Sequence, residues 1–496
     1  MFSSWSRLAL VLALSSPLAT AACTAADDNA SDATEDELNY RSTAGQEYEL
    51  STTVTFAVPA EAQALQGAEK EKAISARADA LRTSILSTIS SEFERMWPED
   101  DRIRNGAVAI QYRQLTSSFR DLVPAGDKYS MTIAGEFGAM KDIETKLPMK
   151  SGADGKKYLP IKATVDAEVE LQIAVKPIER SLDAYPKYLE MFADGLDIGY
   201  FAGGDHNTPP QDIAHAQSVY DDLVRAGFKS PVANFAALKV DSGPLTSKIK
   251  VKGADVDVRV KIFHVNMTPE NDRSALVDAY KHSMKGDDVI IYDGHAGKRL
   301  DYSGVVLAYN PSRVSIPASE FKNVETTDKQ QIYLFNGCET FTGYADALYQ
   351  NPNRKPENTD VITTVNYSAI QRQANQVLAF VHQLIDQKNG NWVPRSWDSV
   401  LGKMNAVGER SWFHGYGVHG LDDNAKVSPI ADVSKVGQSC TSDAQCGSAD
   451  SKCVQKTSTQ KVCGVACADS SGCPNGTKCM LPRGLTSIDD RQCLSN

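Results

Sequence analysis

A histidine and a cysteine stand in similar surroundings in this sequence. The apolar run that ends at Tyr292 is followed by D-G-H-A-G, which contains His295. The apolar run that ends at Phe335 is followed by N-G-C-E-T, which contains Cys338. A thiol becomes a strong nucleophile when a nearby imidazole takes its proton. If the fold brings the two residues together, the Cys338 sulfur could attack a carbonyl carbon while His295 accepts its proton.

The ends of two predicted strands would bring this pair together. In an open α/β sheet, the loops at the carboxyl ends of the strands form the reactive edge, and the chain between His295 and Cys338 can hold one strand with its connections. Backbone N–H groups of Ala296, Gly297 and Cys338 could stabilise an oxyanion at this edge. A short helix predicted at Phe341–Tyr349 would place Cys338 near the helix start, where the helix dipole favours a thiolate.

Each residue taken alone has a simpler interpretation. A lone cysteine at a strand end is more often a small buried apolar residue, and a lone histidine after a strand is more often structural. The pair differs because both residues follow an apolar strand and both are flanked by glycine. This shared setting favours a reactive pair over two unrelated core residues.

A mainly parallel sheet covered by helices on both faces is predicted for residues 191–430. Apolar strands alternate there with amphipathic helices, which is the pattern of an α/β fold. One of these helices follows Pro210 and presents an apolar face up to Val224. The predicted strands are 198–202, 256–265, 289–292, 305–307, 332–335 and 361–365.

An α+β domain is predicted for residues 46–190. A strand at 48–58 precedes a long helix at 61–97, and further β-like runs lie at 130–133 and 161–175. Seven apolar residues of the helix recur every three or four positions and so share one face: Ile74, Ala78, Leu81, Ile85, Ile89, Phe93 and Met96. No catalytic motif is found here, so either a pro-domain or a binding domain fits.

Residues 196–425 resemble the caspase-like (clan CD) cysteine peptidases. V-I-I-Y-D-G-H-A-G and Y-L-F-N-G-C-E-T are similar to the two motifs of that family, and the second is closest to its CHAT and gingipain-like members. The resemblance implies that His295 is the general base or acid and Cys338 the nucleophile, acting on a protein or peptide. It implies no required cofactor, although calcium can stabilise exported members. The family has Gly directly after the histidine, whereas this chain has Ala296 there and Gly297 one residue later.

Two further groups of polar residues could bind a substrate or a metal ion. In G-G-D-H, Asp205 could help to bind a basic residue of a substrate, but a helix-capping role is the more common one for such a residue. His414, His419 and Asp422 match no common zinc spacing, and the glycines between them predict a tight loop. We therefore expect no metal ligands there.

The chain ends in a predicted disulfide-rich module at residues 437–496. Eight of the ten cysteines lie here, and so short an exported segment needs cross-links to fold. A zinc site is the alternative, but the segment has no C-x-x-C pair and no histidine. Its two halves repeat, which predicts two tandem units of two disulfides each. The eight are Cys440, Cys446, Cys453, Cys463, Cys467, Cys473, Cys479 and Cys493.

Residues 1–22 are predicted to be a signal peptide, with Arg7 before a short apolar run. Cys23 follows small residues, as in bacterial lipoprotein signals, and would then carry the lipid. Thr20 stands where Leu is usual in such signals, so ordinary cleavage and secretion remain the alternative. Residues 23–45 are predicted to be an acidic tether. The expected location is the cell envelope, on the outer surface or in the periplasm.

The net charge of −11 argues against a nucleic-acid partner, which needs a basic surface. The sequence therefore predicts an exported cysteine endopeptidase that uses His295 and Cys338. The alternative is an inactive caspase-like surface protein that binds or adheres through its Cys-rich repeats.

Overall fold

The computed structural model of the chain describes residues 40–96, 111–116, 122–141, 143–153, 155–179, 182–205, 210–296, 304–341, 343–366, 368, 370–407, 415–421 and 423–495. The predicted signal peptide, the proposed lipid site at Cys23, and Gly297, His414 and Asp422 lie outside these residues.

The largest sheet has eight strands in the order β1-β19-β16-β15-β12-β9-β11-β10. Five neighbouring strands, from β16 to β11, are parallel. β10 pairs with β11, and β19 pairs with β16, and both of these pairs are antiparallel. The strands are β1 Tyr40–Ser42, β9 Leu196–Ala202, β10 Leu245–Val251, β11 Ala254–Phe263, β12 Val289–Asp293, β15 Gln331–Asn336, β16 Thr359–Thr364 and β19 Tyr416–His419. The predicted mixed α/β architecture with a large sheet is confirmed.

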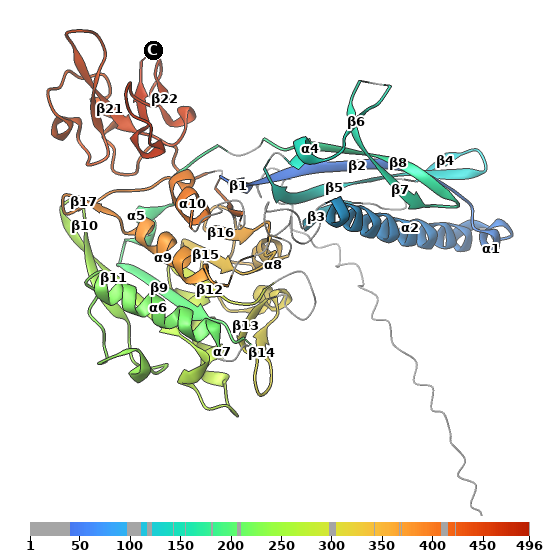
Figure 1. Cartoon of the computed structure of the whole chain (residues 1–496), viewed down its shortest axis with the longest axis horizontal. Coiled ribbons are helices and arrows are strands. Elements are labelled where there is room, and N and C mark those ends of the chain that lie inside the picture. The colour runs from blue at the N-terminus through green and yellow to red at the C-terminus, as the bar shows by residue number, and fades with distance from the viewer. Residues whose placement is uncertain are drawn as a thin grey trace, which may run out of the picture. The chain divides into compact units, whose positions relative to one another are not determined.

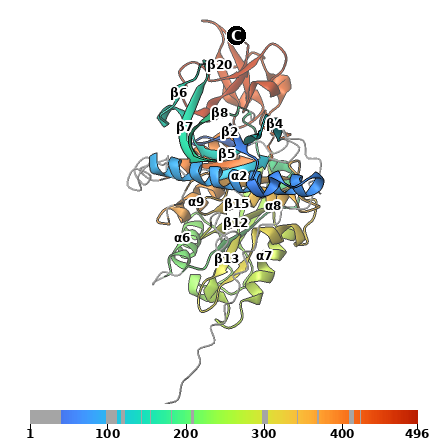
Figure 2. The same ribbon diagram turned by 90° about the vertical axis from the view of Figure 1, so that its right-hand side faces the viewer.

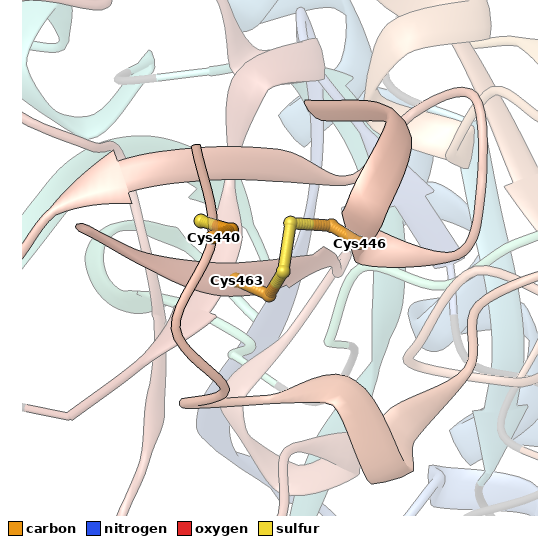
Figure 3. A group of neighbouring side chains, drawn as sticks. All are labelled: Cys440, Cys446 and Cys463. Atoms are coloured by element: carbon orange, nitrogen blue, oxygen red, sulfur yellow. A yellow bond between two sulfur atoms is a disulfide. The ribbon is translucent and has the colours of Figure 1, made fainter. Parts of the chain in front are cut away.

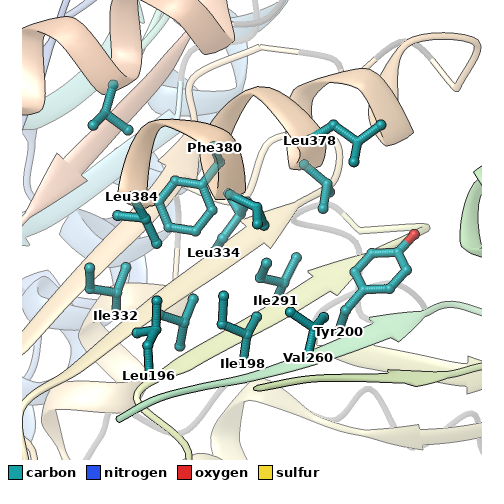
Figure 4. Packing of buried hydrophobic residues seen from close by; sticks show 14 of the residues in the cluster. Leu196, Ile198, Tyr200, Val260, Ile291, Ile332, Leu334, Leu378, Phe380 and Leu384 are labelled. Atoms are coloured by element: carbon teal, nitrogen blue, oxygen red, sulfur yellow. The ribbon is translucent and has the colours of Figure 1, made fainter. Parts of the chain in front are cut away.

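Helices cover both faces of this sheet (Figure 2). Successive strand residues point to opposite faces, so Ile291 and Leu334 belong to one apolar cluster and Ile290 and Phe335 to the other. Phe380 of α9 packs over the first face (Figure 4). The helices on the first face are α6 Gln211–Arg225, α9 Gln373–Leu384 and α10 Trp397–Asn405; those on the second are α7 Ser274–Gly286 and α8 Tyr344–Tyr349.

Short elements account for most differences from the expected pattern. The predicted strand at 305–307 is β13, Val305–Ala308, which pairs with β14, Val314–Ile316, apart from the main sheet. The predicted tight loop near residue 417 contains strand β19 instead, with glycines of positive φ at both ends. Three further short elements are α5 Tyr188–Met191 and the ribbon formed by β17 Gln387–Lys388 and β18 Asn391–Trp392.

The N-terminal sheet has seven strands, and the long helix α2 runs along it (Figure 1). The helix face from Ile74 to Ile89 is buried in one cluster with the strands, as its periodicity predicts. The side chains of Phe93 and Met96 lie outside the description. The elements are β2 Gly45–Ala57, α1 Ala60–Gln63, α2 Gly67–Met96, β3 Gln111–Thr116, β4 Val123–Ala125, β5 Lys128–Met140, α4 Ile143–Lys146, β6 Lys150–Ser151, β7 Lys157–Thr164 and β8 Glu168–Pro177.

The boundaries of this N-terminal domain differ from those expected. Tyr40–Ser42, within the predicted tether, forms edge strand β1 of the main sheet. After β8 the chain returns to the main sheet, because Ala184 and Tyr185 already belong to its core. In the sequence, the N-terminal sheet is therefore inserted between β1 and the remaining strands of the main sheet.

The C-terminal module contains four disulfides, as predicted. The bridges are Cys440–Cys453, Cys446–Cys463, Cys467–Cys479 and Cys473–Cys493. Each repeat thus joins its first cysteine to its third and its second to its fourth. Its strands are β20 Lys452–Gln455, β21 Lys461–Ala466, β22 Lys478–Met480 and β23 Gln492–Leu494.

These bridges bear on metal binding and on the cellular compartment. The sulfurs of Cys440, Cys446 and Cys463 lie close together (Figure 3), but each belongs to a disulfide. Four disulfides indicate an oxidising environment, extracellular or periplasmic. Among the described residues, no helix combines the length and the apolar character that crossing a bilayer requires.

Arg41→Ala tests whether β1 is part of the folded core. Its guanidinium donates two hydrogen bonds to the nearly buried Asp398, at 2.9 and 2.7 Å. Losing them should lower the free energy of unfolding by about 2 kcal/mol in urea denaturation. The control is Lys248→Ala, which removes a solvent-exposed ion pair with Asp257 and should cost less than about 1 kcal/mol. Equal, small effects would show that residues 40–42 are only a tether.

Candidate functional site

His295 and Cys338 follow neighbouring strands at equivalent positions. β12 and β15 are adjacent and parallel, and their last residues, Asp293 and Asn336, lie opposite each other. Each candidate residue comes two positions after its member of this pair. Gly294 N–H also donates to the carbonyl of Asn336 at 3.1 Å. The side chains of both candidates are half-buried. The predicted meeting of the two strand ends is therefore present.

The segments that carry the pair pack against each other without room for extra atoms. A Cβ added to Gly337 would lie 2.3 Å from the Cβ of Ala296. A Cβ added to Gly294 would lie 2.9 Å from the Tyr292 hydroxyl. That hydroxyl donates to the carbonyl oxygen of His295 at 2.6 Å and so fixes the backbone there. The two glycines next to the candidate residues are thus required for close approach.

Cys338 lies in a turn, Gly337–Phe341, that we call the Cys338 turn. Glu339 N–H donates to the Asn366 carbonyl at 2.9 Å, and Thr364 Oγ1 donates to the Gly337 carbonyl at 2.6 Å. Glu339 has φ 52°, an uncommon backbone conformation for a residue other than glycine. The turn is thereby held against the residues that follow β16.

Ser368 contacts the sulfur directly and was missed by the sequence analysis. Its backbone N–H donates to Cys338 Sγ at 3.4 Å, and the thiol lies 3.6 Å from its carbonyl oxygen. Ser368 stands just after the apolar strand at 361–365, but only the structure shows that this strand pairs with β15. A third strand end therefore contributes to this site.

The thiol is protonated in this arrangement at neutral pH. Burial raises the pKa of Cys338 to about 11; the Ser368 N–H opposes this rise and the charge of Glu339 adds to it. The expected help from a helix dipole is wrong, because α8 begins only at Tyr344 and has six residues. Cys338 thus needs a base to remove its proton as it attacks.

A buried polar network lies beneath the candidate pair. Asp293 accepts hydrogen bonds from Asn336 Nδ2 at 2.9 Å and from the Tyr200 hydroxyl at 2.8 Å. Asn336 Oδ1 in turn accepts from the hydroxyls of Tyr416 and Ser368. The network joins the ends of β9, β12 and β15 to the residues after β16.

Burial raises the pKa of Asp293 to about 6, although His215, Tyr200 and Asn336 each act to lower it. The carboxyl group is therefore poised to titrate in the mildly acidic range. His215 Nδ1 lies 3.7 Å from Asp293 Oδ2.

Asp205 caps helix α6. Its Oδ2 accepts from the backbone N–H groups of Gln211 and Asp212, at 2.6 and 2.9 Å. This is the capping role that was weighed against a substrate pocket, and binding of a basic substrate residue stays a prediction. Burial, with the charges of Asp293 and Asp205, raises the pKa of Asp212 well above its ordinary value.

Other candidate positions lie away from the pair. His419 is buried on β19, with Nε2 3.0 Å from Thr363 Oγ1. A pocket of about 500 Å³ lies between Leu238 and α7, and one of about 280 Å³ lies beside Arg395 and Asp450. Neither pocket is lined by His295 or Cys338.

The pH dependence of Cys338 alkylation tests the state of the thiol. Because only the thiolate reacts, the iodoacetamide rate of the folded protein should rise about tenfold per pH unit. It should level off near the pKa of about 11. Mass spectrometry of the Cys338 peptide gives the rate. A plateau below pH 8 would mean that a thiolate–imidazolium pair already exists at rest, contrary to this description.

The raised pKa of Asp293 predicts a pH-dependent stability. Its folded-state pKa of about 6 exceeds its ordinary value of 3.8, so the folded chain binds this proton more tightly than the unfolded chain. Stability should therefore increase as the pH falls from 7 to 5, by roughly 1 kcal/mol from this group. Asp293→Asn should remove this contribution to the pH dependence of the unfolding free energy, measured by urea denaturation at each pH. An unchanged slope in the variant would contradict the assigned burial effect.

Comparisons with known proteins give no relative. No family model matches the chain, and no significantly similar protein was found among curated sequences or solved structures. Any function must therefore be inferred from the residues and geometry of the chain itself.

Proposed function

We propose that the chain is an exported cysteine endopeptidase with a caspase-like core, in which Cys338 and His295 form the catalytic pair. The observation that supports this most strongly is their equivalent placement after the paired ends of β12 and β15. Both side chains keep part of their surface exposed.

The proposed reaction begins with attack of Cys338 Sγ on the peptide carbonyl carbon. His295 accepts the thiol proton as the C–S bond forms, and the oxyanion lies near the backbone N–H groups of Ala296, Gly297 and Cys338. The C–N bond then breaks, and His295 gives its proton to the departing amine. Water, deprotonated by His295, attacks the thioester carbonyl, which releases the new carboxyl group and restores the thiol.

The protonated resting thiol decides which form of this mechanism applies. With a pKa of about 11, Cys338 holds its proton until a base removes it. His295 therefore acts as a general base during attack, rather than as one half of a resting ion pair. A protonated thiol also fits the second candidate function, an inactive caspase-like surface protein, whose binding through the Cys-rich module is proposed from the sequence repeats alone.

The proposed location follows from the termini. Export agrees with the four disulfides of the C-terminal module, and Cys23 would hold the protein at a membrane surface through attached lipid. A lipidated Cys23 would carry more than one acyl chain, since a single chain anchors a protein only marginally.

Cleavage of an unfolded protein substrate tests the proposal. Cys338→Ala and His295→Ala should each lower the cleavage rate about 1,000-fold or more, because each removes one member of a unit that acts together. Gel electrophoresis with mass spectrometry of the products measures the cleavage.

His282→Ala is the matched control, since this histidine is exposed on α7 and lines the larger pocket, which contains neither His295 nor Cys338. It should leave the rate unchanged. Circular dichroism should show that all three variants remain folded. The peptidase would be rejected, and the binding protein favoured, if cleavage persists in Cys338→Ala. Failure of the wild type to cleave any unfolded substrate would have the same meaning.

A further inference from the structure

Four buried side chains meet close to the Cys338 turn. Tyr40 comes from β1, Met140 ends β5 of the N-terminal sheet, Phe341 ends the Cys338 turn, and Val365 follows β16. We call this group the Phe341 cluster. The rings of Tyr40 and Phe341 meet edge to face with centroids 5.1 Å apart. The cluster thus joins the N-terminal sheet to two of the strand ends that form the candidate site.

The N-terminal sheet approaches this cluster through a residue without a side chain. A Cβ added to Gly138 of β5 would lie 2.8 Å from two ring carbons of Phe341 and 2.8 Å from Val365 Cγ1. On the other side, a Cβ on Gly415 would lie 2.8 Å from Val365 Cγ2 and 2.9 Å from Met140 Sδ. Neither position can accept a larger residue unless the cluster moves.

Movement of the cluster would be transmitted to the thiol. Phe341 N–H donates to the Thr364 carbonyl at 3.0 Å, so the Cys338 turn is tied to the end of β16. Cys338 stands three residues before Phe341, and Ser368, which contacts the sulfur, stands three residues after Val365. Close-packed interiors pass such displacements on rather than absorb them.

We propose that β5 of the N-terminal sheet positions Cys338, by holding the Phe341 cluster and so fixing the Cys338 turn. The N-terminal domain is then a structural part of the candidate site rather than a separable addition. This inference goes beyond the proposed function, because it concerns the surroundings of one thiol and applies whether or not the chain cleaves peptides.

Gly138→Ala tests the inference through the reactivity of Cys338. The added methyl group should push Phe341 outward and open the turn, so that water reaches the sulfur. The midpoint of the alkylation profile should then fall from about 11 toward the ordinary 9. The rate at pH 8 should rise roughly tenfold or more. The control Gly286→Ala, with no atom within 4 Å of the added group, should keep the wild-type profile.

Met140→Ala provides a second, independent change at the same cluster, in case the first variant does not fold. It removes the side chain that β5 contributes and should move the midpoint in the same direction. If Gly138→Ala and Met140→Ala, or whichever of them folds, keep the wild-type midpoint of alkylation, the N-terminal sheet does not position Cys338. Peptide cleavage is a separate readout: a chain that never cleaves but whose thiol responds to these changes rejects the proposed function and retains this inference.

Discussion

The parallel pairing of β12 with β15 is the interaction on which the candidate site depends. It sets Asp293 opposite Asn336, and the side-chain hydrogen bond between them, at 2.9 Å, continues the pairing below the surface. A shift of one residue would turn every side chain of a strand to the opposite face of the sheet. Because both strands are buried on both faces, that shift is strongly disfavoured, and His295 and Cys338 remain at equivalent positions.

The site is built from more of the chain than these two strands. Ser368 follows β16 and contacts the sulfur, and Phe341 connects the Cys338 turn to the N-terminal sheet. Tyr40, which begins β1, also contacts Phe341, edge to face. The N-terminal domain follows β1 in the sequence, before the other strands of the main sheet, and it packs against the turn that carries the thiol.

Local patterns predicted the buried parallel strands and the long helix α2, but they missed other elements, among them β10 with seven residues and α10 with nine. Apolar runs and helical periodicity identify β12, β15 and α2, because each has enough residues for its pattern to be clear. β1 has three residues, and β19 has four, of which one is glycine and the other three each stand next to a glycine, so neither shows a period. Helix α8 begins at Tyr344 rather than at Phe341, because Gly343 stands directly before it in a left-handed conformation. Ser368 could not be found from sequence alone, because its contact with Cys338 depends on the neighbouring strand. The raised pKa of the thiol likewise depends on burial by distant parts of the chain.

The most direct test of the account is covalent labelling by a peptide acyloxymethyl ketone at pH 7, read as the mass of the intact protein. Such a reagent needs a thiol that a neighbouring base activates within a site that holds a peptide. A catalytic pair should give one label, at Cys338, in the wild-type protein and none in His295→Ala. Equal labelling of the two proteins, or no labelling of the wild type, would contradict a catalytic partnership between the imidazole and the sulfur.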